Sequence, residues 1–102
     1  MKFGLPDRTI KLLKDYFIKQ GNVSMVKIYG SRATGKYEKG SDIDFALYTK
    51  SKEDISSKIR AELDELPTPY KYDVLDYECI NNNALKNEID KFGVVFYTNS
   101  VG

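Results

Sequence analysis

The sequence predicts a small α+β (α/β) domain in which about four strands form a mixed β-sheet, with helices packed mainly on one face. Segments with apolar residues every three or four positions alternate along the chain with short β-branched segments, and helices between strands favour such a sheet. The 102 residues, 41% hydrophobic and 30% charged, are enough for one globular domain over 1–102 and too few for two.

Three segments have the spacing of amphipathic helices. In residues 6–20, Ile10, Leu13 and Phe17 recur at intervals that bring side chains to one helix face. A second helix is predicted over 53–66, after a Ser-x-x-Asp capping signature and before two prolines. The signature is formed by Ser51 and Asp54, and the apolar face by Ile55, Ile59, Leu63 and Leu66.

The third helix follows the asparagines Asn81–Asn83 and ends at Gly93, because asparagine caps helix starts and glycine favours helix ends. Its apolar stripe consists of Leu85, Ile89 and Phe92, at helical spacing. These three side chains are therefore predicted to face the core.

Four short segments are predicted to form the strands. The clearest one alternates, so that Ile43, Phe45 and Leu47 face one way while two aspartates, Asp42 and Asp44, face the other. The apolar face is expected to meet the helices, which leaves both aspartates on the other, open face. The predicted strands are 23–29, 42–48, 70–77 and 94–98, with a polar loop over 31–40.

The composition excludes several kinds of site. The chain has no histidine, which excludes histidine-ligated zinc and catalysis by Ser-His or Cys-His pairs, and one cysteine, Cys79, which excludes an intramolecular disulfide. A net charge of +1 argues against direct nucleic-acid binding. No apolar run approaches the roughly 20 residues of a membrane span and the N-terminus has no secretory h-region, so the cytoplasm is the expected location.

Asp42 and Asp44 form a D-x-D pair on the open face of their predicted strand. Residues i and i+2 of a strand lie roughly 6.5–7 Å apart with their side chains on one face. Two carboxylates so placed can converge on a hard cation, and Mg²⁺ is usually held by one or two carboxylates together with waters and substrate phosphates. Taken alone, such a pair is more often a solvated surface.

Gly30 and Ser31 come directly after the predicted strand 23–29. A strand that breaks at a glycine can aim backbone N–H groups at an anion, phosphate above all, and the serine hydroxyl adds a donor. Arg32 adds a charge that can pair with phosphate oxygens. Taken alone, a turn glycine followed by a capping serine is the more common explanation.

A third carboxylate lies on the predicted strand 70–77, where a charged residue is disfavoured unless its face is wet or functional. Asp73 and Asp76 have opposite parity on that strand, so only one of them can share the face of Asp42 and Asp44. Parity alone leaves the choice open.

Together, the Gly-Ser turn, the D-x-D pair and the third carboxylate are typical of sites for metal-dependent phosphoryl or nucleotidyl transfer. Two metal ions would stabilise the attacking and leaving oxygens, and a carboxylate would take the proton from the incoming hydroxyl. Bound cations would also relieve the repulsion between neighbouring carboxylates.

The segment GSRATGKYEKGSDIDFAL resembles the signature of the minimal nucleotidyltransferases of the DNA polymerase beta superfamily. YKYDVLDY resembles the family's third-carboxylate strand, and NNNALKNEIDKFGVVFYT is similar to its closing helix and strand. The resemblance covers Val23 to Thr98 and implies a nucleotidyltransferase-like fold, with 1–102 as a single minimal nucleotidyltransferase domain.

The resemblance also implies roles for individual residues. Asp73, the first aspartate of DVLD, would be the third metal ligand and the base. Thr34 departs from the family, in which a second arginine is common at this position, and this lowers the local positive charge. The implied triphosphate contacts are Gly30, Ser31 and Arg32, and the implied magnesium ligands and catalytic residues are Asp42, Asp44 and Asp73.

Solitary members of this family resemble antitoxins whose partner is a small all-helical HEPN toxin, a ribonuclease. The resemblance therefore implies Mg²⁺-dependent transfer of AMP from ATP to a tyrosine of such a toxin. Two alternatives remain open: an antitoxin that neutralises its partner by binding without catalysis, and the catalytic subunit of a small-molecule nucleotidyltransferase of the antibiotic-modifying kind.

Overall fold

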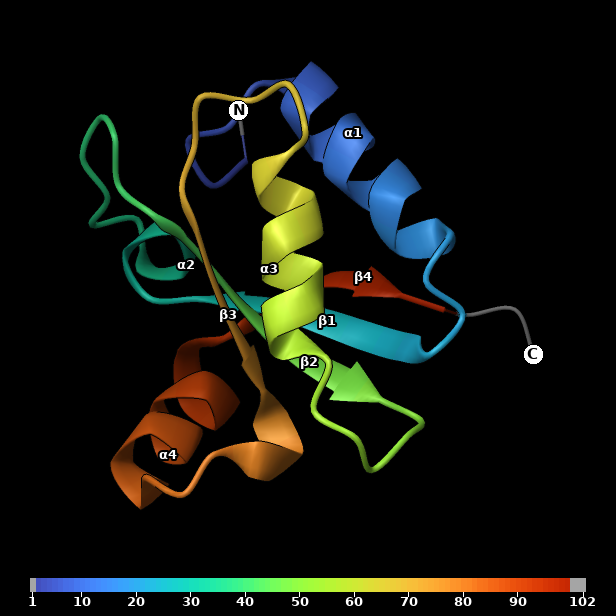
Figure 1. Ribbon diagram of the computed structural model, residues 1–102. Coiled ribbons are helices and arrows are strands. Elements are labelled where there is room, and N and C mark those ends of the chain that lie inside the picture. The colour runs from blue at the N-terminus through green and yellow to red at the C-terminus, as the bar shows by residue number, and fades with distance from the viewer. Residues whose placement is uncertain (1, 100–102) are drawn as a thin grey trace.

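A single four-stranded sheet organises the computed structural model, which describes residues 2–99 (Figure 1). The strand order is β3-β2-β1-β4, and β1 pairs antiparallel with both β2 and β4, whereas β2 pairs parallel with β3. The sheet is therefore mixed, as predicted. The strands are β1 (Val23–Tyr29), β2 (Ile43–Thr49), β3 (Tyr72–Asp76) and β4 (Val94–Thr98).

The helices lie on both sides of this sheet (Figure 1). Two helices, α1 and α3, cover one face, and α4 packs on the other; the short α2 follows β1 directly. Within residues 2–99, no helix combines the length and apolar character needed to cross a bilayer. The helices are α1 (Asp7–Ile18), α2 (Ser31–Thr34), α3 (Ser56–Asp64), the 3₁₀-helix η1 (Tyr77–Cys79) and α4 (Asn83–Phe92). The α+β fold class is thus confirmed.

Helix α3 begins at Ser56, later in the chain than its sequence pattern predicts. Asp54 accepts hydrogen bonds from the Ser56 N–H (2.9 Å) and hydroxyl (2.6 Å). Ser51 instead accepts from the N–H of Glu53. The Ser-x-x-Asp signature therefore forms two consecutive turns rather than a capping box, because each side chain bonds only two residues ahead.

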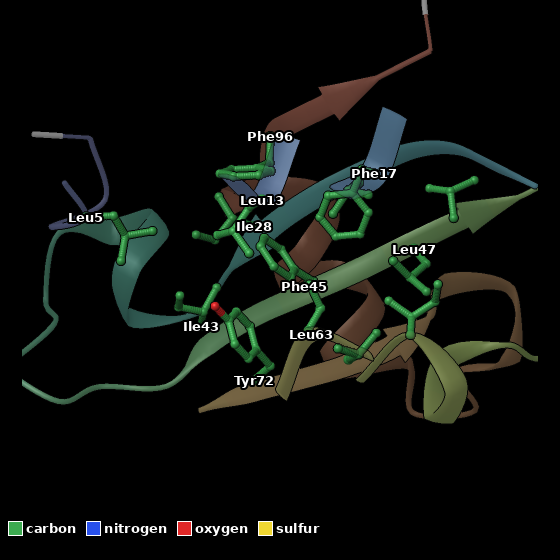
Figure 2. Packing of buried hydrophobic residues seen from close by; sticks show 14 residues of the cluster. Leu5, Leu13, Phe17, Ile28, Ile43, Phe45, Leu47, Leu63, Tyr72 and Phe96 are labelled. Carbon is green, nitrogen blue, oxygen red and sulfur yellow. The ribbon is translucent and has the colours of Figure 1, made fainter. Parts of the chain in front are cut away.

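The main hydrophobic core lies between the sheet and the helices α1 and α3 (Figure 2). Phe17 of α1 packs edge-on against Phe45 of β2, with ring centroids 5.3 Å apart, and Phe96 of β4 packs 5.1 Å from Phe45. Ile43 and Leu47 point to the same side as Phe45, as their alternation predicts (Figure 2). Burial of these aromatic and aliphatic groups fixes which face of β2 turns inward.

A smaller cluster lies between α4 and the opposite face of the sheet. Ile89 of α4 is fully buried there against Tyr29 and Ala46. The face that carries Asp44 is therefore not entirely open, because the apolar stripe of α4 needs an apolar surface and finds it there. This helix forms one wall of the site described next.

Candidate active site

A row of polar side chains crosses three strands on the α4 face of the sheet. Asp44 of β2 pairs with Tyr29 of β1 on one side and with Asp73 of β3 on the other. Directly paired residues of neighbouring strands point to the same face, and the strands lie about 4.8 Å apart. Asp42 precedes β2 and lies two residues from Asp44. The structure thus brings the predicted carboxylates to one end of the sheet.

The strand register distinguishes Asp73 from Asp76. Tyr72, Val74 and Asp76 are buried on the core face of β3, whereas Asp73 is exposed on the face shared with Asp44. The Asp76 carboxylate accepts hydrogen bonds from the Glu78 N–H (3.1 Å) and the Thr49 hydroxyl (3.4 Å). Asp76 therefore caps η1 on the far side of the sheet, and Asp73 is the aspartate that lies beside Asp44.

The site concentrates negative charge around Asp44. Partial burial, followed by the charges of Asp73, Asp42 and Glu88, raises the pKa of Asp44 to about 6, while Arg32 acts in the opposite direction. Burial and the charges of Asp73, Asp44 and Glu88 also raise the pKa of the Tyr29 hydroxyl. A cation bound between these groups would relieve their repulsion.

The residues of this row fit a magnesium ion in their chemistry. Its aspartates offer carboxylate oxygens, the ligands that hard cations prefer, and Mg²⁺ takes its remaining ligands from water and substrate phosphates. Their oxygens are not drawn together into a tight trio. Among residues 2–99, the trio of acidic or cysteine side chains whose ligand atoms all lie within 4.8 Å of one another is Asp54, Asp76 and Cys79.

That second trio is already engaged in local structure. Asp76 caps η1 and Asp54 accepts two hydrogen bonds from Ser56, so both carboxylates stabilise backbone turns. Cys79 is the last residue of η1, and burial together with the charges of Asp76 and Asp54 raises the pKa of its thiol. The two carboxylates of this trio therefore stabilise local turns, and Asp76 lies at the end of β3 opposite to Asp73.

Gly30 connects β1 to α2 beside Asp44. Its φ of +74° lies in the left-handed region, which favours glycine. A Cβ atom at this position would collide with the Oδ2 atom of Asp44. The first N–H of α2 to bond within the helix is that of Ala33, to the Gly30 carbonyl (3.1 Å), so the N–H groups of Ser31 and Arg32 precede the helical ladder.

Gly30→Ala is expected to abolish any activity that requires Asp44 in its present position. The new methyl group both strains the backbone at positive φ and displaces the Asp44 carboxylate, so we expect a loss of about 2 kcal/mol in unfolding free energy. Urea denaturation measures this loss. Gly35→Ala is the matched control, because Gly35 also has a positive φ (82°) but a Cβ there meets nothing within 4 Å. An equal loss of unfolding free energy in the two variants would contradict the proposed collision with Asp44.

A pocket of about 580 Å³ adjoins this turn between α2 and α4. Gly30 and Ser31 line it at the end of β1, and Glu88 and Phe92 line it from α4. The remaining lining residues are Ala33, Thr34 and Lys36. A pocket of this size can hold a ligand as large as a nucleotide.

The structure corrects the position predicted for Arg32. Its side chain is 3% exposed and is not part of the pocket lining. The guanidinium donates to the Ser41 carbonyl through Nε (3.2 Å) and Nη2 (2.9 Å), and to the Phe3 carbonyl through Nη1 (2.9 Å). It is held between the rings of Tyr37 and Tyr70, 5.3 and 5.2 Å from their centroids.

Arg32 is thus a positioning residue, and each of its three guanidinium nitrogens already donates to a backbone carbonyl. By donating two hydrogen bonds to the Ser41 carbonyl, it fixes the end of the loop that leads into Asp42 and Asp44. The sequence does not reveal this, because the carbonyl partners come from distant loops. The contact predicted between Arg32 and a triphosphate is therefore not available in this arrangement.

Three pocket residues, Lys36, Glu88 and Phe92, are missed by reasoning from the sequence. Phe92 belongs by its spacing to the buried stripe of α4, yet its side chain is 49% exposed and turned to the pocket. Glu88 precedes it by one helical turn. The one available signal was that Phe92 is the last residue of the helix, directly before Gly93 and β4.

The chain matches the family model described as Polymerase beta, Nucleotidyltransferase, over residues 11–101. No curated protein matches the sequence. A nucleotidyltransferase-like protein of Sulfolobus solfataricus, described only as a "putative nucleotidyltransferase", is 28% identical with a TM-score of 0.56, covering 93% of this chain and 85% of that chain.

Two toxin–antitoxin structures share the fold at lower identity. One is a toxin–antitoxin with AMP-PNP, with 21% identity, a TM-score of 0.61, and coverage of 92% of this chain and 73% of that one. The other is a tri-AMPylated Shewanella oneidensis HEPN toxin in complex with MNT antitoxin, with 17% identity, a TM-score of 0.54, and coverage of 87% and 72%. At these identities, the two similarities show a shared fold alone.

Proposed function

The chain belongs to the polymerase beta nucleotidyltransferase family, and on that basis we propose that it is a Mg²⁺-dependent antitoxin that transfers AMP from ATP to a tyrosine of a HEPN-type toxin. One observation carries this proposal: Asp44 and Asp73 are paired across neighbouring strands beside the pocket lined by Gly30 and Ser31. Carboxylates for a metal next to a cradle for phosphate are what nucleotidyl transfer requires.

Each group has a role in the proposed reaction. The N–H groups and hydroxyl at Gly30 and Ser31 hold the triphosphate, and Asp42, Asp44 and Asp73 hold Mg²⁺, with two ions proposed. Bound Mg²⁺ supplies charge stabilisation for the attacking and leaving oxygens. Asp73 is proposed as the base, because it is exposed on the edge strand β3 and so is open to an incoming hydroxyl.

The proposed transfer forms one bond to the α-phosphorus of ATP and breaks one. The tyrosine oxygen of the acceptor attacks the α-phosphorus of ATP, the bond from that phosphorus to the bridging oxygen breaks, and pyrophosphate leaves. Asp73 accepts the proton that the tyrosine loses. The product is a tyrosine–AMP phosphodiester on the partner.

The partner and setting are part of the same proposal. The fold is that of chains found with HEPN toxins, and one such toxin is described as tri-AMPylated, which supports a toxin tyrosine as acceptor. We propose that residues 1–102 act as one minimal nucleotidyltransferase domain, and that it works in the cytoplasm, where ATP is the donor.

The proposal is tested by incubating the protein with its helical HEPN-type partner, Mg²⁺ and ATP labelled on the α-phosphate. Label should appear on a partner tyrosine, and ATP labelled on the γ-phosphate should give none, because AMP is the group transferred. Asp42→Asn/Asp44→Asn and Asp73→Asn should each lower the rate at least about 10³-fold. Asp64→Asn, an exposed change on α3, should leave the rate unchanged.

Two outcomes would contradict the proposal. An unlabelled partner that is nevertheless inhibited by the Asp42→Asn/Asp44→Asn variant would indicate neutralisation by binding alone. Labelling of a small hydroxyl compound in place of the partner would indicate a small-molecule nucleotidyltransferase.

A further inference from the structure

Helix α4 presents an aromatic ring and a carboxylate to the pocket that contains the phosphate cradle. Phe92 and Glu88 lie four residues apart on α4, and both line the same pocket as Gly30 and Ser31. Four residues correspond to about one turn and 6 Å along the helix axis. The two side chains therefore form adjacent parts of one wall.

This wall is unsuited to phosphate. The lining of the pocket is mostly apolar, and a negatively charged Glu88 repels a triphosphate. The ring of Phe92 is half exposed, with the ammonium of Lys91 5.2 Å from its centroid, so an apolar surface faces the pocket without covering the core. If only a triphosphate occupied the pocket, the α4 wall would remain unused.

The wall does suit the rest of a nucleotide. An aromatic side chain stacks on the face of a base, and a carboxylate accepts hydrogen bonds from the hydroxyl groups of a ribose. Glu88 and Phe92, one turn apart on α4, line the same pocket as Gly30, and a Cβ atom at Gly30 would meet the Asp44 carboxylate. The α4 wall therefore lies beside the phosphate cradle and near the metal row, where the ribose and base of a bound ATP would need a surface.

We propose that α4 is the nucleoside-binding wall of this protein, on which Phe92 stacks with the base and Glu88 accepts hydrogen bonds from the ribose hydroxyls. This inference rests on the proposed function, since it takes the triphosphate to lie at Gly30 and Ser31. It assigns nucleotide recognition to two residues of the same domain that carries the metal ligands. Phe92 sets affinity for any nucleobase, because stacking is tolerant of base identity.

The test measures binding rather than transfer, by calorimetric titration of the protein with ATP and with inorganic tripolyphosphate, both with Mg²⁺. Phe92→Ala should weaken ATP binding about 10-fold and leave tripolyphosphate binding unchanged, whereas Phe92→Tyr should retain ATP binding. Ile18→Ala is the matched control, because Ile18 is a 63% exposed apolar residue on α1, away from the pocket. It should change neither titration.

The role of Glu88 is tested by comparing ATP with 2′,3′-dideoxy-ATP. The wild-type protein should bind ATP about 10-fold more tightly than the dideoxy compound, and Glu88→Ala should bring this ratio close to one. Tripolyphosphate should bind Glu88→Ala at least as tightly as the wild type, because a repelling charge is removed.

The outcomes separate this inference from the proposed function. The nucleoside-binding wall is wrong, and the proposed function stands, if the wild type binds ATP and labels its partner but Phe92→Ala has unchanged affinity for ATP. The same conclusion follows if Phe92→Ala weakens tripolyphosphate binding by the same factor as ATP binding. If the wild type binds neither ATP nor tripolyphosphate and labels nothing, both are wrong.

Discussion

Asp44→Asn is expected to abolish AMP transfer and, at the same time, to make the metal-free protein more stable at pH 7. The substitution removes a proposed metal ligand, which should cost at least about 10³-fold in rate. It also removes a charge that the fold tolerates poorly. Burial and the neighbouring charges of Asp73, Asp42 and Glu88 raise the pKa of Asp44 to about 6 from an ordinary value of 3.8.

The sign of the stability change follows from this raised pKa. Between about pH 4 and pH 6 the folded state binds more protons at Asp44 than the unfolded state, so wild-type stability falls as the pH rises through this window. At pH 7 the Asp44 carboxylate is largely ionised, so the wild type has nearly the full loss of stability. The neutral asparagine side chain causes no such loss. Solvent screening at this half-buried site limits the gain to about 1 kcal/mol.

Urea denaturation at pH 5 and pH 7 in EDTA measures this effect as the difference between variant and wild type. The variant should be more stable than the wild type at pH 7, and about half of this difference should remain at pH 5, the middle of the titration window. Saturating Mg²⁺ should make the wild type more stable than the variant at pH 7, because an ion at 100 times its Kd stabilises the wild type by about 2.7 kcal/mol. A variant that is less stable than wild type at pH 7 in EDTA would contradict this account of Asp44.

Arg32→Ala is expected to lower the free energy of unfolding by about 3–4 kcal/mol, a larger loss than that of a typical surface change. The substitution leaves the Ser41 and Phe3 carbonyls without their charged donor and removes the guanidinium from between Tyr37 and Tyr70. Arg32→Lys should lose about 1–2 kcal/mol, since an ammonium cannot reproduce the paired donation from Nε and Nη2 to Ser41.

Equilibrium urea denaturation measures the loss, with Arg60→Ala as the matched control. Arg60 is exposed on α3, and its truncation should change stability by less than about 0.5 kcal/mol. Calorimetric titration with tripolyphosphate, at a temperature where the variant is folded, separates the two roles considered for Arg32. Unchanged stability combined with lost tripolyphosphate binding would show that Arg32 acts on phosphate after all.

The elements of the fold were predictable because their periodicities are local. Ile10, Leu13 and Phe17 mark a helix face, and the alternation through Phe45 marks a half-buried strand, without any knowledge of distant partners. The start of α3 was predicted too early, because Ser51 and Asp54 satisfy both a capping box and a pair of turns. Only the hydrogen bonds of Asp54 to Ser56 distinguish the two.

For the candidate site, the sequence predicts the residue types but leaves the register open. The choice between Asp73 and Asp76 depends on the parallel pairing of β3 with β2, which turns Asp73 to the side of Asp44 and buries Asp76. Arg32 and Phe92 illustrate the opposite error. Their sequence patterns point to phosphate and to the core, respectively. In the structure the arginine donates to the carbonyls of Ser41 and Phe3, and the phenylalanine at the end of α4 lines the pocket.

The parallel pairing of β2 with β3 has a consequence for how the site is assembled during folding. Gly30, Ser31 and Asp44 are brought together by β1, one loop and β2, which are adjacent in the chain and pair antiparallel. Asp73 joins them only after the chain has crossed over through α3 and β3 has docked. Closing this longer loop costs more entropy and is slower. A chain caught before docking would retain the phosphate cradle and lack the proposed base, so hydrogen exchange should find the β3 amides opening before those of β1.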